Sequence, residues 1–170
     1  MSINYVKPQK TVKRFLAKGV VGEFYDASIR KTRTFVLGTT GYVGRIHTSA
    51  DGKNAVLGGT GAIVGILTGG KQLTKVGLGE TGEVEKGVSA QFSKFCHVWV
   101  KPGSNVAFGG ALQYNTTTGV ISTPTGASGA DAGCVLLEKA SVIEGCTGAT
   151  VTQTGATGYG DTLAAIELAY

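Results

Sequence analysis

Short apolar segments separated by glycine-rich turns constrain the fold of this chain more than any other feature. Glycine supplies 28 of the 170 residues, more than double its average usage of about 7%. Candidate strands rich in β-branched and aromatic residues recur at a spacing of roughly 8–12 residues, with turn signals between them. This pattern predicts an all-β fold, either a small β-barrel or a jelly-roll-like sandwich.

The stretch from residue 88 to residue 118 shows this pattern most clearly. Residues 95–100, Phe-Cys-His-Val-Trp-Val, have the composition of a strand. Pro102 and Gly103 favour a turn after it, because proline cannot donate a ladder hydrogen bond and glycine adopts tight-turn conformations. Extended chain resumes over residues 106–114. We therefore expect residues 95–100 and 106–114 to be adjacent antiparallel strands.

Other turn and strand signals continue along the chain. Asp51 and Gly52 form a strong tight-turn signal, and the polar run 115–119 predicts another reversal. The last apolar run, residues 163–168, could be helical by composition, but its short length and its place after a Gly-rich loop favour a closing strand. Further strands are expected within residues 42–46, 55–57, 62–67, 134–137 and 149–152.

Basic residues are concentrated at the start of the chain. Residues 1–33 hold eight cations and two acids, a net charge of +6, whereas residues 34–170 have a net charge of −1. We expect an extended basic N-terminal arm with the first short strands over residues 1–33, and a single β-rich domain over residues 34–170. Such an arm can bind an acidic protein surface or nucleic acid, or it can be a solvated start to the chain.

The cysteine and histidine positions predict no metal site. Cys96, Cys134 and Cys146 show no CxxC spacing, and a zinc site that also used His47 and His97 would need ligands from distant parts of the chain. The odd number of cysteines favours reduced thiols in a protein made in a cytoplasm. No apolar run approaches the 18 or so residues of a membrane span, and no segment has the pattern of a signal peptide.

Two motifs resemble catalytic or cofactor sites but lack what the chemistry needs. The glycine turn at residues 38–44 resembles the turn that opens dinucleotide-binding domains, which requires a helix directly after it. Here a β-branched run follows, and it ends at the Asp51-Gly52 turn. Cys96 and His97 are neighbours on a predicted strand, so their side chains point to opposite faces and cannot form a catalytic pair. We expect His97 to be structural and Trp99 to be a packing anchor that is at least half buried.

The second half of the chain carries an ordered set of strand and turn motifs. His-Val-Trp-Val at 97–100 is followed by Gly-Gly at 109–110, Leu-Gln-Tyr-Asn-Thr-Thr-Thr-Gly at 112–119 and Leu-Ala-Ala-Ile-Glu-Leu at 163–168. This order resembles the capsid cement (decoration) proteins of tailed bacteriophages, which show an IWV strand, a GD turn, a VYYN…TG strand and turn, and a final LAVIEL strand. The chain departs from that pattern in its Gly-Gly turn, its longer basic start and its long Gly/Thr loop at 122–133.

The resemblance implies a structural protein of a bacteriophage head, made in the host cytoplasm and located on the outer surface of the capsid. It implies no enzymatic activity and no cofactor. The expected partner is the lattice of the major capsid protein, which such proteins bridge and stabilise, and we expect a homo-oligomer without membrane or direct nucleic-acid contact. The candidate capsid contacts are the cations and apolar residues of the arm: Lys7, Lys10, Lys13, Arg14, Phe15, Leu16 and Lys18.

Two alternative functions remain open at the level of sequence. The first is a nucleic-acid-binding module that uses the basic arm, although such modules interleave aromatic residues with cations and most aromatic residues of this chain lie elsewhere. The second is a dinucleotide-binding enzyme that uses the 38–44 turn. A protein with little helix would remove the second alternative.

Overall fold

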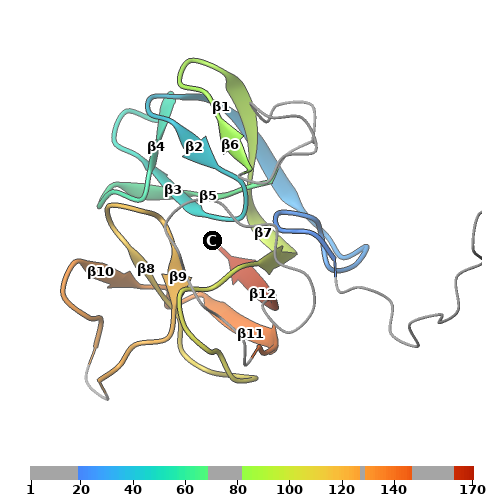
Figure 1. The fold of residues 1–170 in the computed structure, drawn as a ribbon. Helices are drawn as coiled ribbons and strands as arrows, with labels where there is room; N and C mark the ends of the chain where they lie inside the picture. Colours follow the sequence, from blue (N-terminus) through green and yellow to red (C-terminus); the bar gives the residue numbers. More distant parts are fainter. Residues whose placement is uncertain (1–18, 69–81, 127–128, 147–162) are drawn as a thin grey trace, which may run out of the picture.

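A computed structural model describes residues 19–68, 82–126, 129–146 and 163–170 of the chain (Figure 1). These residues form twelve strands and no helix, which confirms the all-β prediction. The strands are β1 Lys31–Leu37, β2 Gly41–Tyr42, β3 Ile46–Ser49, β4 Asn54–Leu57, β5 Ala62–Leu67, β6 Glu83–Val84, β7 Ser89–Val100, β8 Gln113–Asn115, β9 Ile121–Ser122, β10 Cys134–Leu136, β11 Ala140–Glu144 and β12 Ala164–Ala169.

Five strands close into a barrel, which occupies the upper half of Figure 1. The sheet runs in the order β1-β4-β3-β5-β7, and β7 pairs with β1 to complete the circle. Leu37, Leu67 and Phe92 are buried together in the apolar cluster of this half, and Val84 of the short β2–β6 pair packs against them. Because the barrel is closed, each of these five strands pairs with a neighbour on both sides within the barrel.

The backbones of β5 and β7 approach closely at Gly65, where the two strands pair. Gly65 has φ of +128°, and a Cβ there would lie 2.3 Å from the carbonyl oxygen of Ser93. The Ser93 hydroxyl lies 3.1 Å from the hydroxyls of both Thr32 and Thr68, so it links β1 to the end of β5. Glycine at residue 65 is therefore a requirement of the closure.

The long strand β7 belongs to two structures at once. Its first half pairs with β1 and β5 in the barrel, and residues 95–100 pair with β12, which in turn pairs with β11. We call the part made by residues 95–100, β12 and β11 the lower sheet (Figure 1). The main apolar core lies against it and includes Val98 and Ile166, together with Tyr114 and Ile121 from the separate β10-β8-β9 sheet.

Several local predictions are confirmed. Residues 95–100 are extended, and the last apolar run forms the closing strand β12 at the centre of the lower sheet. The 115–119 reversal joins β8 to β9: the Asn115 side-chain oxygen accepts hydrogen bonds from the backbone of Thr117 and Thr118, and Gly119 adopts φ of +64°. The expected strand at 149–152 lies outside the described residues.

The predicted hairpin between residues 95–100 and 106–114 is wrong. Both edges of residues 95–100 are taken, one by β12 and the other by the segment before β1. Residues 106–112 instead form an irregular segment, and β8 begins at Gln113. A strand has only two edges, and these partners come from residues far away along the chain, so a local turn signal could not identify them.

Candidate functional site

The segment that joins the basic arm to the body lies along the free edge of the lower sheet. We call residues 19–26 the strap. The strap amides of Gly22 and Tyr25 donate to the carbonyls of Trp99 and His97 at 2.8 and 2.9 Å, and the Trp99 amide donates to the Glu23 carbonyl at 2.9 Å. The strap thus covers the edge of β7 opposite β12, and it follows residues 1–18 directly in the sequence.

The side chain of Trp99 packs against the strap. It is 7% exposed, which confirms the expected burial, and it packs with Leu163 and Ala165 in a small cluster separate from the main core. The ring of Tyr25 meets it edge-on with centroids 5.1 Å apart. A Cβ at Gly19 would lie 2.2 Å from Cδ1 of the indole, so the strap begins in direct contact with this ring.

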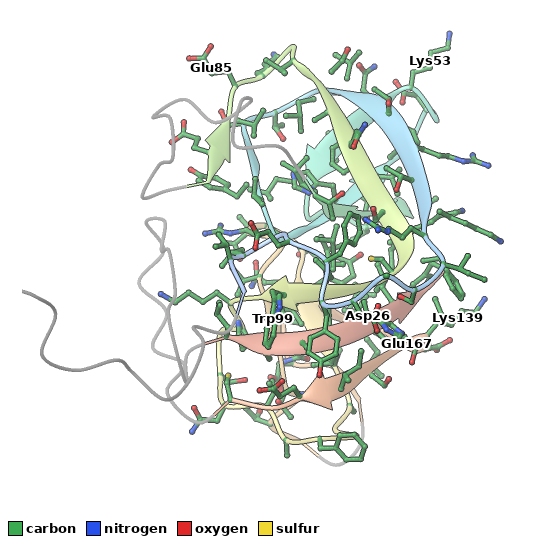
Figure 2. The ribbon with its side chains drawn as sticks, turned by 90° about the vertical axis from the view of Figure 1, so that its right-hand side faces the viewer. Asp26, Lys53, Glu85, Trp99, Lys139 and Glu167 are labelled. Atoms are coloured by element: carbon green, nitrogen blue, oxygen red, sulfur yellow. The ribbon has the colours of Figure 1, made fainter. Side chains whose placement is uncertain are left out.

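A polar row crosses the outer face of the lower sheet beside Trp99. The Nδ1 atom of His97 lies 2.8 Å from a carboxylate oxygen of Asp26, and its Nε2 lies 3.9 Å from one of Glu167. Ser141 of β11 donates to the other Glu167 oxygen at 3.3 Å. Figure 2 shows Asp26, Trp99 and Glu167 on the same face. The row therefore ties the strap to β7, β12 and β11.

Hydrogen bonding sets the charge state of the strap carboxylate. The Ser28 side chain and backbone amide and the His97 ring hold the pKa of Asp26 at about 2, well below its ordinary value of 3.8. Asp26 is therefore ionised near neutral pH, and it accepts hydrogen bonds rather than exchanging protons.

The Cys96–His97 pair has the alternation expected of a strand. Cys96 lies in the main core, where burial raises the pKa of its thiol to about 12, so that it is not a thiolate nucleophile. His97 lies on the opposite face, in the polar row. This geometry provides a structural histidine and no catalytic pair.

The glycine turn at 38–44 leads into β3, not into a helix. A Cβ at Gly41 would lie 2.8 Å from the Leu37 side chain, and Gly44 has φ of +77°. Close packing and turn conformation account for these glycines, and the helix terminus that would bind a pyrophosphate is missing from this part of the described chain.

Within residues 19–68, 82–126, 129–146 and 163–170, no group of three or more His, Cys, Asp or Glu side chains could hold a metal ion. In the same ranges, no helix has the length and apolar character needed to cross a bilayer.

The cations after the strap continue the basic character of the arm. The guanidinium of Arg30 lies 4.2 Å from the centre of the Phe24 ring, and the ammonium of Lys31 lies 5.9 Å from the centre of the Phe95 ring. β1 begins at Lys31, so the predicted boundary between residues 33 and 34 falls within this strand. The division of the chain into arm and domain stays a prediction.

The predicted contact residues of the arm all lie outside the described residues. The structure instead brings together a strap, a buried tryptophan and a polar row that sequence reasoning did not connect. Trp99 was singled out as an anchor, but the sequence held no signal for its partners in the strap and in β12. The predicted arm contacts that lie outside the described residues are Lys7, Lys10, Lys13, Arg14, Phe15, Leu16 and Lys18.

Comparison with known proteins gives a family match and similar solved structures. Residues 8–169 match the family model described as structural cement protein (E217 gp24/Pam3 gp6). A chain in the solved structure of the capsid of Myoviridae phage XM1 has a TM-score of 0.64 and 15% sequence identity, covering 96% of this chain and 98% of that chain. At this identity the likeness shows a shared fold. No curated protein matches the sequence.

Proposed function

The chain belongs to the phage structural cement protein family, and from this premise we propose that its β body binds the outer face of the major capsid protein lattice. The protein is a structural component of the phage head that stabilises the capsid, as its resemblance to cement proteins predicted. We further propose that residues 1–18 add contacts to an acidic patch of a capsid subunit or of a neighbouring cement copy.

The separation of charge between arm and body carries this proposal. Residues 1–18 contain five cations and no acid, whereas residues 19–170 contain eleven of each. The strap, which follows the charged segment in the sequence, is hydrogen-bonded to the lower sheet. An 18-residue segment can reach up to about 60 Å when extended, which is enough to touch an adjacent subunit.

Exposed ion pairs alone would hold the arm weakly. Each is worth about 0–1 kcal/mol, so several must act together with burial of the apolar residues Val12, Phe15 and Leu16. Packaged DNA lies inside the shell and a cement protein lies outside it, so the partner of the arm is a protein surface and not nucleic acid. Assembly into a homo-oligomer would raise the effective concentration of each further contact.

The test adds full-length protein, and protein lacking residues 1–18, to phage heads assembled without cement protein. At low salt we expect the truncated form to keep its folded β body but to occupy fewer sites than the full-length form. The difference should shrink at moderate salt, because screening weakens exposed charge pairs. A full-length variant with Lys7, Lys10 and Lys13 changed to Gln separates the loss of charge from the loss of length.

Equal occupancy by the full-length and truncated forms would show that the arm is only a solvated start to the chain. Tight, salt-sensitive binding of the free protein to duplex DNA would favour nucleic acid as the partner of the arm. Either result leaves the membership of the cement family intact.

A further inference from the structure

The turn beside β11 displays an aromatic side chain to solvent. Phe108 is 81% exposed, the highest value among the exposed large apolar side chains of the described residues. Its neighbours Ala107, Gly109 and Ala111 are also exposed, and none of them carries charge. Exposed runs of apolar residues are unfavourable unless another surface covers them. The yellow loop that contains this turn lies at the lower end of Figure 1, away from β1 and β4.

Hydrogen bonds hold the turn in one conformation. The amide of Gly110 donates to the carbonyl of Ala107 at 3.0 Å, which closes a tight turn around Phe108 and Gly109. The amide of Gly109 donates to the carbonyl of Val142 in β11 at 3.0 Å. Gly109 adopts φ of +69°, a conformation that other residues rarely adopt. Phe108 is therefore presented on a fixed backbone.

The chain just before the turn is also fixed to the body. Val106 exchanges two backbone hydrogen bonds with Cys146, at 3.1 and 3.0 Å, and its side chain is 4% exposed in the main core. A Cβ at Gly145 would lie 2.4 Å from the Val106 carbonyl oxygen, so these two segments touch. An aromatic side chain on a fixed backbone needs little backbone ordering when it binds, which makes it a favourable anchor for an interface.

We propose that Phe108 inserts into an apolar pocket of the major capsid protein and anchors the body of this cement protein on the shell. This inference rests on the proposed function and assigns one contact to it.

Membership of the cement protein family favours a capsid subunit over a second copy of this chain as the partner of Phe108. A phenylalanine buries roughly 150–250 Å², and its neighbours in the turn are only alanine and glycine. A stable complex buries about 800 Å² on each partner, so this turn is too small to hold any partner by itself. The turn can therefore act as one anchor of the attachment to the capsid, together with contacts from the arm and from the rest of the body.

The experiment titrates full-length protein onto heads assembled without cement protein and measures the half-saturating concentration. We expect Phe108→Ala to raise it about 30-fold, the effect of removing an interface anchor. Its thermal unfolding should be unchanged, because the side chain is exposed in the free protein. Val36→Ala is the matched control: Val36 is 40% exposed but lies on β1 of the barrel, and it should change the titration less than twofold.

A second variant tests the rigid presentation itself. Gly109→Ala keeps Phe108 but strains the positive-φ position, and a Cβ there meets no atom within 4 Å, so no clash is added. We expect attachment about fivefold weaker than that of the unmodified protein.

The outcomes separate the two proposals. Failure of the unmodified protein to bind heads would overturn the proposed function. Normal binding of the unmodified protein with equal binding of Phe108→Ala would overturn the anchor and leave the function standing. If light scattering shows that Phe108→Ala no longer forms the oligomer of the unmodified protein, but it still binds heads equally well, Phe108 belongs to a contact between copies. This result would also overturn the anchor.

Discussion

The barrel and the lower sheet close their edges by different means. In the barrel, each of five strands pairs with two others, and the circle is completed where β7 meets β1. In the lower sheet, the free edge of β7 is covered by the strap. The outer edge of β11 is covered by the irregular segment around Val106 and Gly109, through single bridges and isolated hydrogen bonds.

This difference separates stability from attachment. A closed barrel needs no outside partner, because its strands have no open edges within the circle. One segment that covers the lower sheet is the strap, which follows residues 1–18 in the sequence, and the other displays the exposed Phe108. We therefore expect the lower sheet to face the capsid and the barrel to point away from it.

Loss of the strap anchor should have the largest effect. Trp99→Ala should reduce the free energy of unfolding by about 3–5 kcal/mol, because it leaves a cavity beneath the strap. Urea unfolding gives the magnitude, and faster hydrogen exchange at the amides of Gly22 and Tyr25 would locate the damage. Tyr25→Ala is the control, since it removes one ring contact but keeps the indole in place, and it should cost clearly less. Unchanged stability of Trp99→Ala would show that the strap is held by its backbone alone.

A methyl group between the paired strands β5 and β7 tests whether barrel closure is as demanding as the geometry indicates. Gly65→Ala should cost about 2–5 kcal/mol, the sum of positive-φ strain and a contact with the Ser93 carbonyl. Gly52→Ala also has positive φ but meets no atom within 4 Å, so it should cost only about 1–2 kcal/mol. Equal losses in thermal unfolding would mean that the close approach at Gly65 relaxes without cost.

A histidine inside the barrel gives this half its own pH dependence. His47 is fully buried against Phe92, its Nδ1 lies 3.1 Å from the Arg45 carbonyl oxygen, and its Nε2 has no hydrogen-bond partner within the described residues. Burial lowers the pKa of His47 from 6.5 to about 4. The unfolded chain therefore takes up a proton first as pH falls, so stability should fall by about 3 kcal/mol between pH 6.5 and 4.

The stabilising effect of the strap carboxylate Asp26 should be lost at a lower pH than the range over which His47 lowers stability. The pKa of Asp26 is lowered to about 2, so its stabilising effect is present above pH 4 and is lost as pH falls toward 2. Urea unfolding at a series of pH values should show both steps. His47→Gln should remove the step between pH 6.5 and 4, and Asp26→Asn should leave it in place. An unchanged step in His47→Gln would assign it to another group.

Local signals in the sequence predicted elements, but not their partners. The composition of residues 95–100, the Asp51-Gly52 turn and the closing strand at the C-terminus follow from neighbouring residues, and all three match the structure. The partners of residues 95–100 come from β12 and from Phe24, and no local pattern encodes such long-range pairing. For this reason the predicted hairpin was wrong although both of its segments contain strands.

The candidate site shows the same division. Trp99 could be identified as an anchor because a single tryptophan in a β-branched strand is usually buried. Its contacts with Gly19 and Tyr25 depend on where the strap lies along the edge of β7, which the sequence alone does not specify. The sequence does not distinguish Phe108 from a buried aromatic residue, because an aromatic residue among small ones also suits a core turn, and only its exposure in the structure sets it apart.

Hydroxyl-radical footprinting of the free protein and of the protein bound to heads tests the central claim most directly. The account predicts that Tyr25 and Phe108, which flank the lower sheet, lose reactivity on binding, whereas Val36 on the barrel keeps its reactivity. All three side chains are exposed in the free protein, so each can report a change. Protection of Val36 with unchanged Tyr25 and Phe108 would mean that the barrel faces the capsid, and would contradict the account.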